Sequence, residues 1–247
     1  MLKLIITAIM FMTALLCQGQ VSETRKTEGF SNIEVASGIE LSYKETEGET
    51  SIRVEANEDA PANIITEVEG ETLRIFADGK TKNVKVYVSA KDIASFKASS
   101  KSKIVFENTV HAENIAIALE SGAYFKGYFK SNGQTDVETG MGTEFNGRIE
   151  TVAFKGNFKN HSKINISGNA KNAILKSATE AYCNAKNFLT ENTEVASDNS
   201  TVIITSRNKI DVKATENASV TYFGSPKTVT IGNKSFKYVR PALVAME

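Results

Sequence analysis

The sequence predicts an all-β protein whose main part is a single-stranded, right-handed parallel β-helix, with a β-rich cap at its N-terminal end. Three observations support this prediction. Between Ile93 and Pro226, a short run of small and polar residues closed by an apolar residue recurs at a nearly constant interval. Apolar and polar residues alternate around each closing position, which is the period of a strand. No segment in this region keeps the period of a helix.

The closing apolar residues define the repeat. They are Ile104, Phe125, Phe145, Ile164, Tyr182, Val202 and Val220, and their successive numbers differ by 21, 20, 19, 18, 20 and 18. A step of this size fits one coil of three short strands and three corners. One coil cannot bury its own apolar face, so stacked coils share a core, and six steps predict a rod of roughly 29 Å. A β-sandwich with a strand about every ten residues is the rival architecture.

Residues 1–19 are expected to be a signal peptide. Lys3 is the only charge ahead of an uncharged apolar run from Leu4 to Leu16, which is too short for an ordinary transmembrane helix. Cleavage is expected after Gly19, and residues 20–29 are expected to form a flexible leader.

The two cysteines raise separate questions. Lipidation of Cys17 is the alternative to cleavage after residue 19, although Leu16 is a poor residue ahead of a lipidated cysteine. A membrane partner is expected only in that case. Cys183 would be the single cysteine of the mature chain, so it cannot form an internal disulfide. We expect it to pack as a small apolar residue beside Tyr182.

Residues 30–92 are expected to form the β-rich cap or the first coils, and residues 93–226 the repeated coils. Glu69–Glu71 and Ala77–Lys80 indicate hairpin turns within the cap. A cap would cover the open end of the stack, which is otherwise an unpaired edge. Beyond the coils, Thr228–Ile231 and Phe236–Val239 are expected to pair as a last hairpin, with a short tail within residues 232–247.

Three segments resemble a known family. They are Phe30–Ile39, Glu69–Ile75 and the closing Tyr222–Pro226, together with the repeated small-residue corners. The chain resembles the putative auto-transporter adhesin, head GIN domain family over residues 30–231. The resemblance implies a β-helical fold and export, typically from Bacteroidetes-type bacteria, and it supplies no active site. The family's Ser-Gly corners persist here only at Ser121-Gly122 and Thr139–Gly142.

Composition narrows the classes of partner. The 29 basic and 29 acidic side chains cancel, whereas a nucleic-acid binder would carry a basic stripe. The balance also gives no reason to expect attraction to anionic lipid. We therefore expect no nucleic-acid partner.

No catalytic, cofactor or metal site is predicted. Acidic residues that could share a ridge are Glu120, Glu138 and Glu144, and basic ones are Lys126, Arg148 and Lys155. Two carboxylates about 5–10 Å apart could hydrolyse a glycosidic bond, but a solenoid needs solvated outward residues on every coil. His111 and His161 lack metal-binding spacing. Asp198-Asn199 and Asp211 do not make a calcium loop.

A ladder of small polar residues is the remaining candidate surface. Its members are Ser99, Ser121, Thr139, Ser177, Ser197 and Thr215. Such residues can bond along the stack, which is a structural role, or form a ridge that contacts a glycan or a protein.

The function predicted is therefore that of an exported, non-enzymatic solenoid that binds an unknown protein or glycan through an extended surface, in adhesion or in the cell envelope. A polysaccharide-active lyase or hydrolase and a periplasmic structural or regulatory module are the alternatives. The expected location is the periplasm or the cell surface, and the oligomeric state is open.

Overall fold

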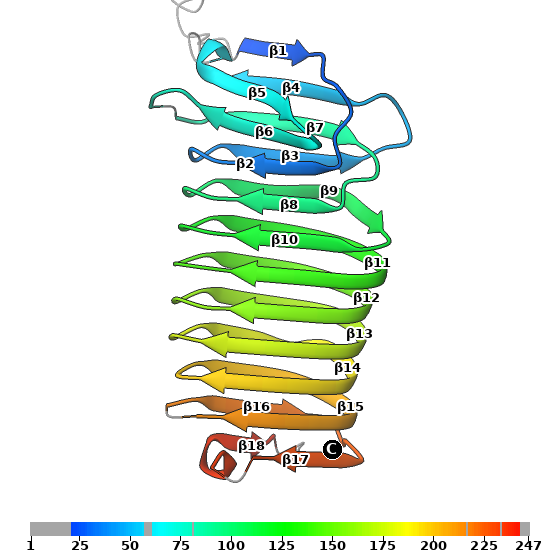
Figure 1. Ribbon diagram of the computed structural model, residues 1–247, viewed down its shortest axis with the longest axis vertical. Helices are drawn as coiled ribbons and strands as arrows, with labels where there is room; N and C mark the ends of the chain where they lie inside the picture. The colour runs from blue at the N-terminus through cyan, green and yellow to red at the C-terminus, as the bar shows by residue number, and fades with distance from the viewer. Residues whose placement is uncertain (1–20, 57–60, 81, 216, 233, 243–247) are drawn as a thin grey trace, which may run out of the picture.

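The structure is a computed structural model that describes residues 21–56, 61–80, 82–215, 217–232 and 234–242. The predicted signal peptide and Cys17 lie outside these residues. The chain forms one elongated parallel β-solenoid of about 8 turns (Figure 1). It runs along the front of the coil, returns behind and descends, which is a right-handed path. The only described helices are two short 3-10 turns, so no helix there is long or apolar enough to cross a membrane.

Each coil of the central stack is almost one continuous strand. These strands are β11 (Tyr124–Thr139), β12 (Glu144–Phe158), β13 (Lys163–Ala178), β14 (Tyr182–Asp198) and β15 (Thr201–Ala214). Each pairs in parallel with the next. In β12 the buried positions run 145, 147, 149 and 151 and then shift to 154, 156 and 158, so the strand bends at Val152 and Ala153. The predicted coil of three strands and three corners is therefore wrong, because each coil has two arms, one gradual bend and one tight turn.

The first arms of the coils stack into one face of the solenoid, and the second arms into the other. The first-arm face follows the order β1 (Val21–Arg25), β4 (Ser51–Ala56), β7 (Lys85–Ala90), β3 (Glu40–Glu45), β9 (Lys103–Ala112), β11 to β15, β16 (Ser219–Phe223) and β18 (Val239–Pro241). The second-arm face follows β5 (Ile64–Glu69), β6 (Thr72–Ala77), β2 (Asn32–Val35), β8 (Ser95–Ala98), β10 (Ile115–Leu119), β11 to β15 and β17 (Thr228–Ile231).

The N-terminal region does not stack in chain order. The coil made by β2 and β3 comes first in the sequence but lies between the β6–β7 coil and the β8–β9 coil (Figure 1). Above it, β4 runs antiparallel to β7, and β1 runs antiparallel to β4. The flexible leader predicted over residues 20–29 is wrong at Val21–Arg25, because these residues form β1.

One of the three predicted hairpins is confirmed and two are wrong. The turn at Glu69–Glu71 joins an antiparallel pair, β5 and β6, as predicted. The turn at Ala77–Lys80 instead joins β6 and β7, which lie on opposite faces of one coil. Likewise β17 and β18 each pair in parallel with the coil above, β15 and β16, and not with each other. The 3-10 turns are η1 (Pro61–Asn63) and η2 (Phe236–Tyr238).

The core is a column of apolar residues in register. Its central rungs are Ile104, Phe125, Phe145, Ile164, Cys183, Val202 and Val220, all 0% exposed. Tyr182 was predicted at the fifth rung, but it is 40% exposed and its neighbour Cys183 takes the place. With Cys183 in place, the successive numbers of the rungs differ by 21, 20, 19, 19, 19 and 18. The coils therefore shorten gradually along the rod.

The tight turn repeats with the same geometry in most coils. Two successive residues take positive φ, as at Ser100 (52°) and Lys101 (63°) or Thr179 (52°) and Glu180 (60°). An i to i+3 backbone hydrogen bond closes the turn, for example from the Ala181 N–H to the Ala178 carbonyl. Such turns favour Gly and Asn because L side chains crowd the backbone there. This chain nevertheless places Ser, Lys, Thr and Glu at these positions.

Candidate functional site

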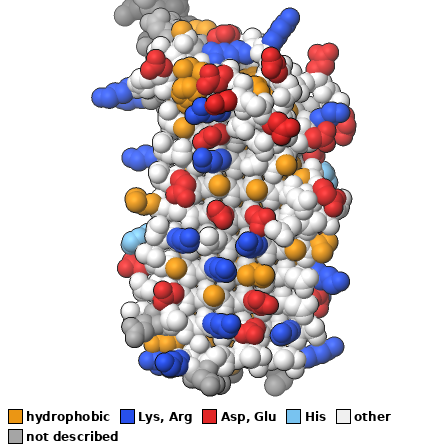
Figure 2. All heavy atoms as spheres, viewed as in Figure 1, with side chains coloured by type: hydrophobic (Ala, Val, Ile, Leu, Met, Phe, Trp, Pro, Cys, Tyr) orange, Lys and Arg blue, Asp and Glu red, His pale blue; other side chains and the backbone are white. Residues whose placement is uncertain are grey.

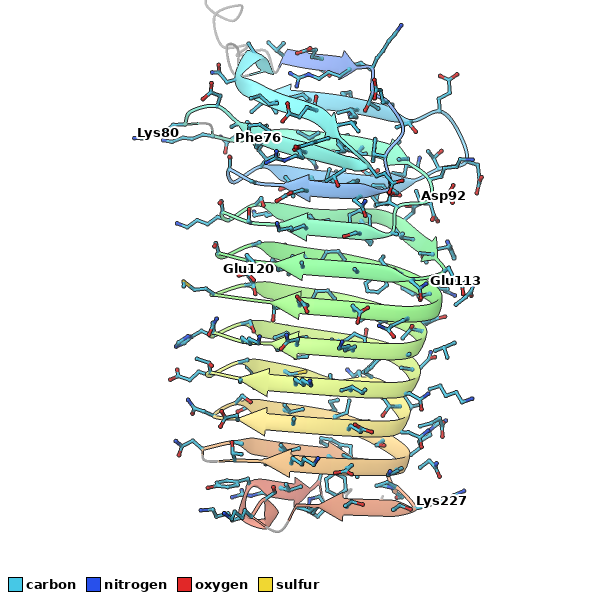
Figure 3. All side chains as sticks on the ribbon, viewed as in Figure 1. Phe76, Lys80, Asp92, Glu113, Glu120 and Lys227 are labelled. Atoms are coloured by element: carbon cyan, nitrogen blue, oxygen red, sulfur yellow. The ribbon has the colours of Figure 1, made fainter. Side chains whose placement is uncertain are left out.

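The predicted acidic ridge does not form. Glu120 lies in a tight turn, at the edge opposite Glu113 (Figure 3). Glu138 is on the second-arm face, where it neighbours Ala118 and Asn157. Glu144 is on the first-arm face, between Tyr124 and Lys163. Glu144 is therefore on the opposite face from Glu138, and the three carboxylates do not share one ridge.

The predicted basic residues are divided between the faces. Lys155 is on the second-arm face, next to Asp136 and Ile174. Lys126 and Arg148 are on the first-arm face in adjacent coils, and they line the same surface depression. Two of the three basic candidates thus contribute to one site.

The histidines make isolated contacts. Nδ1 of His111 lies 2.9 Å from Oε2 of Glu45, and Nε2 of His161 lies 3.0 Å from Oε2 of Glu180 in the next turn. Both imidazoles are largely exposed. Within the described ranges, no three His, Cys, Asp or Glu side chains converge as metal ligands.

The predicted ladder of small residues mixes three different positions. Thr139, Ser177 and Ser197 share one buried register with Ala98 and Leu119. Ser99 and Thr215 each lie one residue beyond this buried register along the chain, and Ser121 lies two residues beyond it. Because the first three hydroxyls point inward, at most 4% exposed, they cannot form a ridge for a partner.

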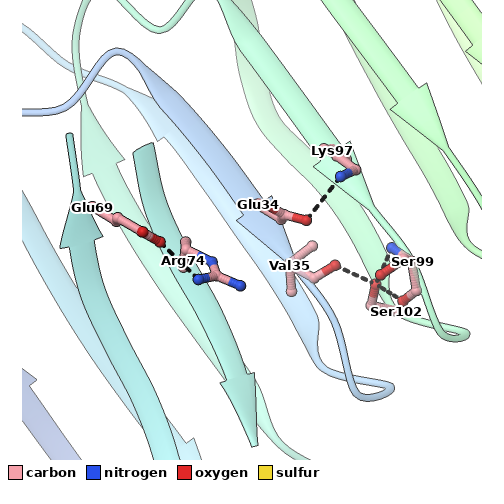
Figure 4. Close-up of polar contacts among 7 residues, drawn as sticks. All are labelled: Glu34, Val35, Glu69, Arg74, Lys97, Ser99 and Ser102. Atoms are coloured by element: carbon pink, nitrogen blue, oxygen red, sulfur yellow. Dashed lines mark hydrogen bonds and ion pairs between the residues drawn. The ribbon is translucent and has the colours of Figure 1, made fainter. Parts of the chain in front are cut away.

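A second buried column, which the sequence reading missed, closes the turns. It contains Ser102, Ala123, Thr143, Ser162, Ala181, Ser200 and Ala218, the residues that directly follow the tight turns. The Ser102 hydroxyl lies within hydrogen-bonding distance of the carbonyls of Val35 (3.0 Å) and Ser99 (2.5 Å) and can donate its one proton to either of them (Figure 4). Ion pairs outside the turn, such as Lys97 with Glu34 at 3.0 Å, link neighbouring coils.

The second-arm face is mixed in charge. Figure 2 shows this face, with basic, acidic and small apolar side chains interspersed over the coils. One outward row runs Arg74, Glu34, Lys97, Ala118, Glu138, Asn157, Lys176, Ala196 and Lys213. Alternating signs give this face no preference for one charge.

The first-arm face carries a groove of about 590 Å³ that crosses five successive coils. One wall is the outward column Val105, Lys126, Asn146, Asn165 and Asn184. The other wall contains Tyr128, Arg148, Ser167 and Asn187, which are also in register. Phe106, Gly127, Gly147 and Ile166 complete the lining between and above them.

Two stacked glycines leave room for core rings beneath the floor of the groove. Gly127 and Gly147 are Cα partners in adjacent coils. A Cβ at Gly147 would lie 2.5 Å from Cε1 of Phe145, and one at Gly127 would lie 2.6 Å from Cδ2 of Phe106. The core rings occupy the space that these side chains would need. The floor of the groove is therefore formed by backbone and by the edges of aromatic rings.

Hydrogen bonds order the amide wall. Nδ2 of Asn165 donates to Oδ1 of Asn146 at 2.9 Å, and Nδ2 of Asn146 donates to Oε1 of Glu144 at 2.9 Å. Oδ1 of Asn184 accepts from the Lys186 N–H at 3.3 Å. Stacked asparagines of this kind are typical of parallel in-register strands, and they hold the amides at fixed places.

The opposite wall begins with an aromatic and cationic cluster. The guanidinium of Arg148 lies 4.8 Å from the Tyr128 ring centroid. The Tyr128 hydroxyl donates to Glu150, and Nζ of Lys130 lies 3.0 Å from Oε2 of Glu150. The Tyr128 hydrogen bond, and after it Lys130, lowers the pKa of Glu150 below its ordinary value. The carboxylate is thus held by its own cluster, 3.7 Å from Arg148.

The lining of the groove is polar and cationic. It offers two cations, several amides, two hydroxyls and ring edges, and its described residues include no carboxylate, imidazole or thiol. The paired acid and base of a glycoside hydrolase are therefore not among the lining residues.

Comparison with known proteins supports the fold at low sequence identity. A putative adhesin from Parabacteroides distasonis is 14% identical, with a TM-score of 0.80 and coverage of 91% of this chain and 97% of its own. A putative adhesin from Parabacteroides merdae is 15% identical, with a TM-score of 0.77 and coverage of 90% and 95%. A putative lipid binding protein from P. distasonis is 12% identical, with a TM-score of 0.74 and coverage of 91% and 97%.

No curated protein matches the sequence. The family described as "Putative auto-transporter adhesin, head GIN domain" matches residues 29–226, which span most of the chain and all the coils from β2 to β16. The chain belongs to the putative auto-transporter adhesin, head GIN domain family.

Proposed function

We propose that this protein is an exported, non-enzymatic binding protein that acts in adhesion through the groove on its first-arm face. The observation that carries the proposal is the groove itself, whose lining combines Lys126, Arg148 and a column of asparagines without an acid–base pair. Family membership supports an adhesion-like role and a surface or secreted location.

The rigid stack suits this role. In a parallel solenoid each coil is paired on both sides, so an outward residue has a fixed place relative to its neighbours along the rod. A ligand that spans several coils then meets donors and acceptors that are already positioned, which reduces the entropy cost of binding.

The test combines location with adhesion. In a deletion strain complemented with the wild-type gene, intact cells are treated with protease and then scored for attachment to mucin and to matrix proteins. We expect deletion and protease treatment each to abolish attachment. Attachment that is unchanged after deletion would exclude the adhesion role. Protection of the protein until the outer membrane is permeabilised would favour the periplasmic module instead.

The charge-reversing variant Arg148→Glu should reduce attachment, and Lys155→Glu on the opposite face is its matched control. Equal losses in the two variants would remove the groove from the proposal. An increase in reducing ends or in unsaturated uronate when the purified protein meets polysaccharides would replace it with the enzyme alternative. One structural neighbour is described as a putative lipid binding protein. Binding of the purified protein to lipid vesicles is therefore measured as well.

A further inference from the structure

We propose that the groove on the first-arm face holds a segment of an acidic polysaccharide, with an anionic substituent on Lys126 and Arg148 and sugar hydroxyls along Asn146, Asn165 and Asn184. This inference rests on the proposed function and names the class of ligand for that site.

The first step is the distribution of charge. Lys126 and Arg148 stand in the second and third of the five coils that the groove crosses, and they are the charged residues among its described lining. Lys126 makes no ion pair with any residue that the structure describes. Arg148 approaches Glu150 at 3.7 Å, while that carboxylate is already bound by Tyr128 and Lys130. Both cations are thus placed to meet one anion between the second and third coils of the groove.

The second step is the amide column. Asn146, Asn165 and Asn184 are successive partners in register, so their side chains repeat about every 4.8 Å along the rod. Each amide carries both a donor and an acceptor, as does a sugar hydroxyl. An acyl chain laid here could not pair with the amide donors and acceptors that are not already used by the contacts among these asparagines and with Glu144 and Lys186, and unpaired buried polar groups are costly. The column therefore favours a ligand that is rich in hydroxyls.

The third step separates a saccharide from a peptide and from a nucleic acid. An extended peptide gains its main-chain hydrogen bonds by adding to a strand edge, but the groove lies on a sheet face whose strands are already paired on both sides. A nucleic acid carries a phosphate on every unit and needs cations along its whole path. Here the cations of the lining come from the second and third of the five coils, and Arg148 shares its coil with Asn146.

The fourth step is length. The lining spans five coils, from Val105 and Phe106 through Asn184 and Asn187, and four steps of about 4.8 Å give a path of roughly 19 Å. Phe106 and Ile166 are 8% and 3% exposed, and they add a small apolar area to the floor of this path. A segment of several residues, rather than a single sugar, fits such a path.

The test uses one polysaccharide backbone with different substituents. Binding of the full-length protein to size-matched dextran, carboxymethyl dextran and dextran sulfate is measured by titration calorimetry at low and at physiological salt. We expect binding to the anionic forms, weaker at high salt, and none to neutral dextran. Comparison of the carboxymethyl and sulfate forms identifies the preferred anion.

The variants locate the site. Lys126→Gln with Arg148→Gln should weaken binding by at least about 10-fold, since each hydrogen bond to a charged group is worth that much or more. The matched control, Lys155→Gln with Lys176→Gln, removes two outward charges from the opposite face and should change affinity less than about 2-fold. Asn165→Leu should weaken binding without changing its salt dependence. Thermal melts confirm that each variant is folded.

Four results would overturn the inference. Unchanged affinity in the double groove variant, or an equal loss in the control, would place the site elsewhere. Equal binding of neutral dextran would remove the acidic specificity. The absence of binding to every polysaccharide would remove the saccharide altogether. Attachment of cells to protein surfaces tests the adhesion proposal separately, so the two can fail independently.

Discussion

Two buried serines in adjacent coils should respond to the same substitution with opposite signs. Ser177 and Ser197 are Cα partners on β13 and β14, and their exposed fractions are 3% and 2%. The hydroxyl of Ser197 lies 2.8 Å from that of Ser200. The hydroxyl of Ser177 has no hydrogen-bond partner among the described residues. The two sites therefore match in residue type and burial, and they differ in whether the hydroxyl has a hydrogen-bond partner.

The magnitude follows from the cost of an unsatisfied buried group. Leaving a polar group buried without a partner costs about 1–3 kcal/mol, whereas a satisfied hydrogen bond contributes about 1 kcal/mol. Ser177→Ala should therefore raise the free energy of unfolding by about 1 kcal/mol, and Ser197→Ala should lower it by about 1 kcal/mol. The volume removed is the same, so any cavity effect largely cancels in the comparison.

Urea denaturation followed by circular dichroism measures both changes, provided that the slope of free energy against urea is the same in each variant. Thr135→Val is an independent check, because Thr135 is fully buried and its hydroxyl also lacks a described partner. This nearly isosteric change should stabilise the fold as well. Destabilisation by Ser177→Ala equal to that of Ser197→Ala would refute the reasoning.

Four further outcomes are expected. Thr179→Asn should raise the unfolding free energy by about 0.5–1 kcal/mol in urea titrations, because a β-branched residue at φ 52° is strained and Asn tolerates that conformation; a loss of stability would contradict this. Phe145→Ala should cost about 3–5 kcal/mol by the same assay, since its ring is fully buried and stacked 4.9 Å from a neighbouring ring. Cys183 should resist thiol reagents at pH 8 until the protein unfolds, because burial raises its pKa to about 12; rapid labelling of the native protein would disprove it. Tyr128→Phe should raise the pKa of Glu150 toward its ordinary value, as seen by NMR titration of the carboxyl carbon, because the phenol donor is lost.

The repeat was predictable because each coil carries its own alternating pattern. The register within a coil was less secure, as the fifth rung shows. Side chains on a strand alternate between faces, so the aromatic Tyr182 and the small Cys183 compete for one inward place. The sequence reading favoured the larger apolar residue, and packing against Ile164 and Val202 selects the smaller one.

The insertion of the β2–β3 coil could not be predicted. Which coil a strand joins depends on contacts between distant segments, such as Ile33 with both Leu73 and Phe96, and local alternation is the same in any order. The groove left a signal, because Asn146, Asn165 and Asn184 recur at a constant interval that matches the length of one coil. That signal has meaning only once the inward register is known, since a shift of one residue turns the column into the core.

The inserted coil also gives the rod two mechanically different ends. At the C-terminal end, β17 and β18 each pair with one strand of the coil above. Tension there can peel the chain one ladder at a time. Toward the N-terminus, β2 lies between β6 and β8, and β3 lies between β7 and β9. Once β1 has detached, further extension must pull a strand from between two others and break both ladders together. A molecule loaded between its ends should therefore unravel from the C-terminus while the N-terminal coils hold.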